Sequence, residues 1–156
     1  MNSLEALRQS QFILTKEYRK FLEFCEACRR ERYIGICFGA AGVGKTLSAQ
    51  YYSRWPLVEA LLEEQNDKWL PKISACSTVL YTPTVSNTPN QIRKGLEEAQ
   101  FDLHRVRYWE TKRSRAYAWD EIALWPDDIP RRTDLLIVDE ADRLKVSSLE
   151  ELRDIY

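Results

Sequence analysis

Gly39-Ala40-Ala41-Gly42-Val43-Gly44-Lys45-Thr46 is the stretch that decides the fold. It follows the pattern G-x-x-x-x-G-K-[ST], in which glycines let the backbone curl until consecutive N–H groups face phosphate oxygens. The helix predicted to follow adds the positive end of its dipole. The sequence therefore predicts a binding site for the phosphates of a nucleoside triphosphate, made by Gly39, Ala40, Ala41, Gly42, Val43, Gly44, Lys45, Thr46 and Leu47.

Two side chains of this stretch carry the expected chemistry. Lys45 is predicted to reach the β- and γ-phosphates and to act as a catalytic cation, and the Thr46 hydroxyl is predicted to bind Mg²⁺, a hard ion that prefers oxygen ligands. The alternative is a glycine-rich turn that matches the pattern by chance. A predicted strand before the loop and a predicted helix after it argue against that alternative.

Strands and helices are predicted on both sides of the loop. Tyr33-Ile34-Gly35-Ile36-Cys37-Phe38 is predicted to be a short buried strand, and two more are predicted at 78–82 and 135–138. Helices are predicted at residues 15–32, 45–55, 57–72, 88–109 and from 147 onwards. The alternation predicts a three-layer α/β/α fold of the P-loop type, in which helices cover both faces of a parallel sheet.

Several helix starts carry capping signals. Thr15 is a predicted N-cap, and Thr88-Pro89-Asn90-Gln91 combines a capping threonine, a first-turn proline and a glutamine three residues after the cap. Ser147 with Glu150 suggests a further capping box. The Cys25-x-x-Cys28 pair lies on the apolar face of the first helix, so packing is a better interpretation than zinc binding.

The second chemical motif is Leu135-Leu136-Ile137-Val138-Asp139-Glu140. A buried strand here delivers two carboxylates to its C-terminal end, where ligands of parallel sheets gather. Asp139 is predicted to hold Mg²⁺, and Glu140 is predicted to be catalytic by polarising the attacking water. A solvated turn is the alternative for an isolated Asp-Glu pair, and the phosphate-binding loop makes it the weaker interpretation.

Size and composition indicate one soluble domain. The 156 residues carry a net charge of −1, and no stretch approaches the ~20 apolar residues of a membrane span. We expect an N-terminal helical segment at 1–32, a nucleotide-binding core at 33–156, a cytoplasmic location and no membrane association. Four cysteines fit a reduced intracellular chain.

Residues 104–119 form a candidate surface for nucleic acid. Basic side chains there alternate with Tyr108, Trp109, Tyr117 and Trp119, a mixture that can neutralise phosphates and stack on bases. In the alternative, the aromatic rings pack inward and the charges are solvated. DNA is therefore a hypothetical partner, with candidate contacts at Arg105, Arg107, Lys112, Arg113 and Arg115.

The phosphate-binding loop, the phrase 136–145 (LIVDEADRLK) and the later Leu152-Arg153-Asp154-Ile155 resemble the AAA+ ATPases that regulate transposition, the TniB, TnsC and MuB type. The resemblance implies a protein that binds ATP and Mg²⁺, self-associates on DNA in its full-length form and recruits a transposase. The nucleotide-site roles carry over to Gly39, Gly44, Lys45, Thr46, Asp139 and Glu140.

The family's pattern continues past these motifs with a further strand, an arginine finger and a helical lid. In that family the further strand lies between the phosphate-loop strand and the acidic strand. We therefore expect a core truncated at its C-terminal side, with a gap in its sheet, weak ATP binding and slow or absent hydrolysis.

Two other functions stay open. A DEAD-box-like helicase fragment is suggested by Asp139-Glu140-Ala141-Asp142 and by Tyr81-Thr82-Pro83-Thr84, although the second glycine pair and the T-P-G-R element of those helicases are absent from the sequence. A nucleotide-binding interaction module that does not hydrolyse ATP is the other possibility.

Overall fold

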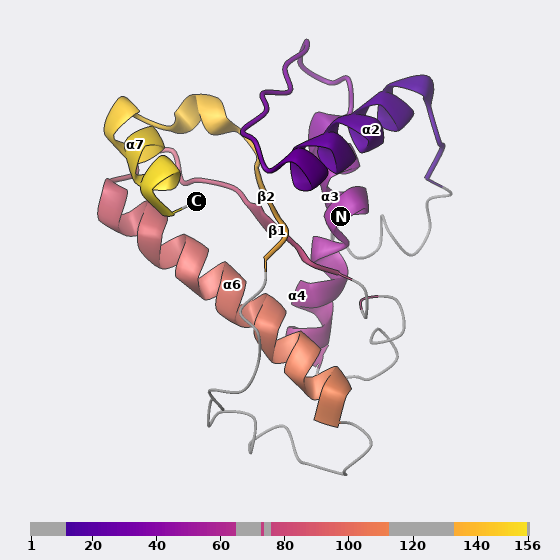
Figure 1. Ribbon diagram of the computed structural model, residues 1–156, viewed down its shortest axis with the longest axis vertical. Coiled ribbons are helices and arrows are strands. Elements are labelled where there is room, and N and C mark those ends of the chain that lie inside the picture. The colour runs from indigo at the N-terminus through magenta and orange to yellow at the C-terminus, as the bar shows by residue number, and fades with distance from the viewer. Residues whose placement is uncertain (1–11, 65–72, 74–75, 113–132, 156) are drawn as a thin grey trace.

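The computed structural model describes residues 12–64, 73, 76–112 and 133–155 of the chain (Figure 1). Its elements in chain order are helices α2 (Lys16–Glu31), α3 (Lys45–Ser53) and α4 (Trp55–Glu64), strand β1 (Thr78–Tyr81), helix α6 (Pro89–Lys112), strand β2 (Leu135–Val138), the 3₁₀ turn η4 (Ala141–Arg143) and helix α7 (Val146–Ile155).

The two strands pair in parallel, with Thr78 opposite Leu135 and Tyr81 opposite Val138. The Asp139 N–H continues the ladder by donating to the Tyr81 carbonyl at 2.9 Å. Because parallel neighbours need a long connection, the chain between the strands includes the 24-residue helix α6. The predicted parallel sheet is confirmed.

Helices lie on both sides of this sheet, as predicted. Figure 1 shows α6 and α7 on one side of the strands and α2 and α3 on the other. Helices α3, α4 and α6 contact β1, while α2 contacts β2. The sequence prediction of an α/β architecture is therefore confirmed.

The core lies between α4, β1 and α6. Val58 and Leu61 of α4, Val79 of β1, and Leu103 and Val106 of α6 are all at most 1% exposed. Burial of such side chains stabilises the fold by roughly 1.5–3 kcal/mol each. In contrast, every residue of β2 is only partly buried, so the core is built on β1.

The predicted buried strand at 33–38 is wrong. This segment has no strand assignment, and Ile34, Ile36 and Phe38 are 79%, 81% and 90% exposed. The other side of the segment lies against α2. At Gly35 the approach is so close that an added Cβ would be 2.5 Å from the Phe24 ring. Among the described residues β2 pairs with β1 alone, so the segment lacks the neighbouring strand that would complete its hydrogen bonds and cover its apolar side.

Several helix boundaries also differ from the prediction. The helix expected at 45–55 ends at Ser53, since Arg54 adopts a left-handed conformation (φ 55°) and the Trp55 N–H donates to Ser53 Oγ at 3.2 Å. The helix predicted at 57–72 is α4, which begins earlier, at Trp55; residues 65–72 of the predicted range lie outside the described residues. Helix α7 begins at Val146, so Ser147 lies inside the helix and does not cap it.

Two capping predictions are confirmed. The Tyr18 N–H donates to Thr15 Oγ1 at 3.1 Å. At the start of α6, the Thr88 N–H donates to Gln91 Oε1 at 2.8 Å and the Gln91 N–H donates to Thr88 Oγ1 at 3.3 Å. This reciprocal pair is the capping box that the sequence predicts.

No helix in the described part of the chain combines the length and apolar character needed to cross a bilayer.

Candidate nucleotide-binding site

The phosphate-binding loop is shaped by two glycines in left-handed conformations. Gly42 has φ 78° and Gly44 has φ 87°, values that L-residues with a Cβ rarely adopt. A Cβ added at either position would meet no atom within 4 Å. The glycines are therefore required by backbone conformation, and the space around them is open to a ligand.

Lys45 closes this loop on itself. Its Nζ donates to the Gly39 carbonyl at 2.8 Å and to the Ala40 carbonyl at 2.9 Å. The ammonium thus reaches back across the loop from the first residue of α3, where it would meet phosphate oxygens lying in the loop. A bound triphosphate would compete with the two carbonyls for these hydrogen bonds.

The start of α3 provides further donors. Gly44 is its N-cap residue and supplies no side-chain hydrogen bond to the first turn. First-turn N–H groups of a helix lack partners inside the helix and favour an anion. Thr46 and Leu47 are exposed in this turn, as binding of a phosphate and its metal ion at this turn requires.

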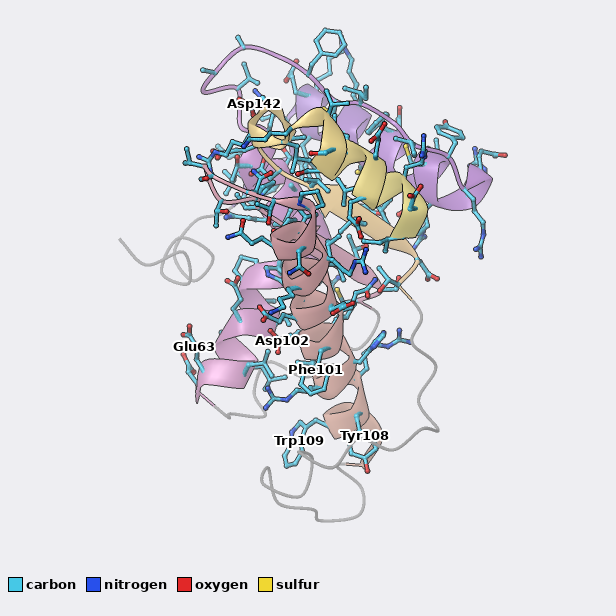
Figure 2. The ribbon with its side chains drawn as sticks, turned by 90° about the vertical axis from the view of Figure 1, so that its left-hand side faces the viewer. Glu63, Phe101, Asp102, Tyr108, Trp109 and Asp142 are labelled. Atoms are coloured by element: carbon cyan, nitrogen blue, oxygen red, sulfur yellow. The ribbon has the colours of Figure 1, made fainter. Side chains whose placement is uncertain are left out.

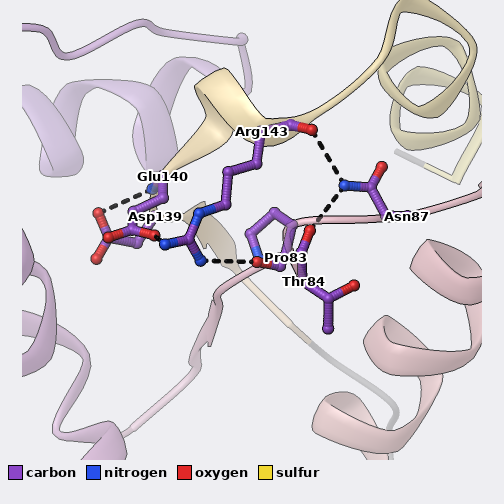
Figure 3. Close-up of polar contacts among 6 residues, drawn as sticks. All are labelled: Pro83, Thr84, Asn87, Asp139, Glu140 and Arg143. Atoms are coloured by element: carbon purple, nitrogen blue, oxygen red, sulfur yellow. Dashed lines mark hydrogen bonds and ion pairs between the residues drawn. The ribbon is translucent and has the colours of Figure 1, made fainter.

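The acidic motif lies at the end of β2. Asp139 Oδ1 accepts a hydrogen bond from the Glu140 N–H at 3.0 Å, and Glu140 has φ 51° (Figure 3). Left-handed conformations are uncommon for residues other than glycine and concentrate at functional sites. The Glu140 carboxylate forms an ion pair with the Arg143 guanidinium.

The loop and the acidic motif lie at the same end of the molecule. Figure 1 shows the chain between α2 and α3 beside the turn that follows β2, and Figure 2, seen from a perpendicular direction, shows Asp142 of that turn at the same end. Parallel strands present their carboxyl ends at one edge of the sheet, where ligands of α/β folds bind. The loop and the turn that carries the acidic motif therefore lie at the same end of the described structure.

Asn87 is a residue that the sequence patterns do not identify. It is 1% exposed, and its Nδ2 donates to the Thr84 carbonyl at 2.9 Å and to the Arg143 carbonyl at 3.1 Å. Its Oδ1 accepts from Ser148 Oγ at 3.1 Å. An asparagine just before a helix start suggests a local turn, so no signal pointed to these contacts with residues near the acidic motif.

The candidate DNA-binding residues are only partly described. Arg105 forms a 3.7 Å ion pair with Asp102 and lies over the Phe101 ring at 5.7 Å. Trp109 is 7% exposed and belongs to the hydrophobic core, and Tyr108 packs against that core; Figure 2 shows both near the end of α6. The positions of Tyr108 and Trp109 agree with the alternative in which the aromatic rings pack inward and do not stack on bases. Arg107 is half-buried on α6, Lys112 ends that helix, and Arg113, Arg115, Tyr117 and Trp119 lie outside the described residues.

Cys25 and Cys28 are buried on α2, as the packing interpretation predicts. Burial, followed by the neighbouring Cys28 and Cys37, raises the pKa of the Cys25 thiol to about 12. The described residues contain no group of three or more His, Cys, Asp or Glu side chains that could hold a metal ion.

The parallel strands, the glycine loop closed by Lys45 and the carboxylates after β2 define an α/β protein with the P-loop fold of nucleoside triphosphatases. The chain belongs to the AAA-domain family, whose profile matches residues 28–156. Family membership and the phosphate loop together identify an AAA-type ATP-binding protein.

A relative from Staphylococcus aureus, named "Potential ATP-binding protein", is 38% identical over 160 residues. The match covers 96% of this chain and 55% of the relative, so the chain spans about half of that protein's length. No solved structure matches the chain.

Proposed function

We propose that the chain binds ATP together with Mg²⁺ in the loop 39–46 and that this is the hydrolysis site of an ATPase, with slow or absent turnover by the 156 residues alone. The observation that carries the proposal is the position of Lys45, whose ammonium lies 2.8 Å from the Gly39 carbonyl at the mouth of an open glycine loop. A cation held there by carbonyl oxygens can exchange them for phosphate oxygens, which bear more charge and bind it more strongly.

The residues present fit a magnesium site. The Thr46 hydroxyl and the Asp139 carboxylate would hold the ion, whose remaining positions are filled by phosphate and water oxygens in sites of this kind. Mg²⁺ supplies neutralisation of the charge on the phosphates.

Glu140 is the proposed proton acceptor. Its carboxylate would accept a proton from the attacking water as the water oxygen bonds to the γ-phosphorus and the bond to the leaving ADP oxygen breaks. Lys45 and the first-turn N–H groups of α3 would stabilise the charge on the phosphate oxygens throughout.

Calorimetry tests the binding step. We expect Mg²⁺-dependent ATP binding by the native chain and at least a tenfold loss of affinity in Lys45→Ala, since a charge-assisted contact contributes about 1.5–3 kcal/mol. Lys16→Ala, which removes the lysine at the first position of α2, is the matched control. Equal affinity in the native chain and Lys45→Ala would contradict the proposal.

We further propose that the protein is a cytoplasmic, DNA-associated regulator of transposition that self-associates and engages a transposase in its ATP-bound state. The support is the likeness of the phosphate loop and of the phrase 136–145 to the regulators of that process. The test compares DNA affinity over a range of salt concentrations for the native chain and for a variant with Arg113 and Arg115 replaced by alanine. We expect a shallower salt slope in the variant, whereas an unchanged slope would count against it.

A second candidate is a nucleotide-dependent interaction module without hydrolysis. The observation that favours it is the ion pair between Glu140 and Arg143, which occupies the carboxylate that hydrolysis requires. ATP binding without turnover, in the chain and in longer forms of it, would favour this candidate over the ATPase.

A further inference from the structure

A groove follows the outer edge of β1, the edge that does not face β2. Its floor is made by Leu80, Tyr81 and Thr82, and its volume of about 340 Å³ is typical of ligand sites. One wall belongs to α3 and α4, and the other belongs to α6. Because α3 and α6 lie on opposite sides of the sheet (Figure 1), the groove opens at the sheet edge. Neither the loop 39–46 nor the acidic motif lines it, so the groove is separate from the proposed ATP site.

The backbone at this edge is available for hydrogen bonding. Among the described residues β1 pairs with β2 alone, and on that side the Tyr81 carbonyl accepts from the Asp139 N–H. Consecutive residues of a strand direct their N–H and C=O groups to opposite edges, so those of Leu80 and Thr82 point away from β2, toward the groove. An open edge of this kind is a template for a further strand.

Both walls of the groove carry carboxylates. Glu59 comes from α4, whereas Glu98 and Asp102 come from one face of α6. Figure 2 shows Asp102 where α6 runs beside α4. Asp102 has an ion pair with Arg105, but neither Glu59 nor Glu98 forms one within the described residues. No basic residue of the described chain lines the groove, so its charge is complementary to lysine and arginine side chains.

Two aromatic residues complete the lining. Trp55 contributes from the start of α4. The Tyr81 ring lies against α6, where a Cβ added to Gly95 would be 2.7 Å from Cε2 of the ring. Aromatic faces attract ammonium and guanidinium groups. A basic side chain in the groove would therefore meet both aromatic and carboxylate partners.

The fold is stabilised less when the carboxyl groups of the two walls are ionised. Burial raises the pKa of Glu59, and the nearby Asp102 carboxylate contributes a smaller increase. Burial also raises the pKa of Asp102, against the effect of the Arg105 guanidinium. A cation placed between the walls would offset both the burial and the mutual repulsion of these charges. Groups that oppose folding are expected where a function requires them.

We propose that the groove binds an extended segment of another protein, which carries neighbouring lysine or arginine residues and adds to β1 as a further strand. The N–H and C=O groups of Leu80 and Thr82 would hold its backbone. Neighbouring residues of a strand point to opposite faces of a sheet. One basic side chain would therefore reach Glu59 on α4, and the next would reach Glu98 or Asp102 on α6.

A synthetic hexapeptide with the sequence TVKRVT, blocked at both ends and labelled with a fluorophore, is the probe. Fluorescence anisotropy measures its binding to the full chain without nucleotide. We expect saturable binding, which the peptide TVEEVT does not show because like charges repel. N-methylation of one set of alternate amides should abolish binding, and methylation of the other set should preserve it, because an added strand bonds through one of its edges.

Substitutions in the two walls test the charge complementarity. Glu59→Gln and Glu98→Gln should each weaken peptide binding about two- to fivefold, the range for a partly exposed ion pair. The matched controls are Glu63→Gln and Glu97→Gln, which remove the same charge from α4 and α6 outside the groove and should leave the affinity unchanged. Urea unfolding of each variant separates a loss of affinity from a loss of fold.

Hydrogen exchange gives a direct readout of strand addition. We expect exchange of the Leu80 and Thr82 amides to slow when the peptide saturates the chain. The inference would be overturned by no saturable binding to the native chain, equal losses in the control variants, equal tolerance of both methylated peptides, or unchanged exchange. Self-association of the native chain that Glu59→Gln with Glu98→Gln abolishes would place a second copy in the groove and would also overturn it. The proposed ATP site would stand in each case.

Discussion

Asn87 and Ser148 are joined by a side-chain hydrogen bond of 3.1 Å across 61 residues of sequence. The bond ties the loop after β1 to the first turn of α7, and both side chains are buried. Since Asn87 also holds the Arg143 carbonyl, one polar cluster connects the sheet edge, the acidic motif and the last described helix.

Replacing Asn87 should destabilise the chain more than replacing Ser148. Asn87→Ala leaves the carbonyls of Thr84 and Arg143 and the Ser148 hydroxyl without this partner, and an unpaired buried polar group costs about 1–3 kcal/mol. Ser148→Ala removes one bond only. Urea unfolding of both single variants and of the double variant measures the two losses and their coupling, and strictly additive losses would contradict a direct link.

Gly44 and Gly39 should respond differently to alanine. Gly44 has φ 87°, so Gly44→Ala strains the loop by about 1 kcal/mol or more and should weaken nucleotide binding. A Cβ on Gly39 would meet only Val43 Cγ2, at an ordinary distance of 3.5 Å. Gly39→Ala is therefore the matched control. We expect its free energy of unfolding to be close to that of the native chain and its loss of nucleotide affinity to be smaller than that of Gly44→Ala. Equal effects in the two variants would show that conformation at Gly44 is not what the motif requires.

Glu59 should be a destabilising charge at neutral pH. Burial raises the pKa of this carboxyl, with smaller contributions from Glu63 and Asp102, against a hydrogen bond from Trp55 that lowers it. A carboxyl whose folded pKa is raised contributes stability that is present below its unfolded pKa and lost as pH rises through the folded pKa. Glu59→Gln should therefore raise the free energy of unfolding at pH 7. On acidification, this free energy should increase less in the variant than in the native chain.

The control for that change is Glu63→Gln on the exposed end of the same helix, a residue labelled in Figure 2. We expect a smaller change in stability than for Glu59→Gln, because Glu63 acts on Glu59 only as a minor repulsive neighbour. A decrease in stability for Glu59→Gln, measured by urea unfolding across the acid range, would show that the charge is stabilised in the fold.

The four thiols should react in two classes. Cys37 is exposed, whereas Cys25, Cys28 and Cys76 are buried, and burial raises the pKa of each of these three thiols. Because the thiolate is the reactive form, a disulfide reagent at about pH 8 should modify one thiol quickly in the native chain and the others only after unfolding. Cys37→Ser should abolish the fast phase. Rapid reaction of a second thiol would contradict the described burial of Cys25, Cys28 or Cys76.

The elements that the sequence predicted well are those with local causes. The helix starts at Thr15 and Thr88 follow from side chains three residues away, and β1 and β2 follow from short apolar runs that end in turn residues. The phosphate loop was predictable for the same reason, since its glycines and Lys45 interact within eight consecutive residues.

The segment 33–38 was not predictable in this way. Its composition is that of a buried strand, and strand formation depends on a neighbour that supplies hydrogen bonds and covers the apolar side. The described residues provide β2 with one partner, β1, and provide none for this segment. An apolar pattern therefore specifies what a segment can form, and the available neighbour specifies what it does form.

By itself, the sequence determined that this protein has a parallel α/β fold and a phosphate-binding loop, because short-range spacing dictates both. The tertiary structure decided that the Arg143 guanidinium reaches the Pro83 carbonyl and that Asn87 joins Arg143 and Ser148. Contacts of Asn87 across more than 50 residues depend on how the strands and helices pack, and no local spacing of polar residues encodes them.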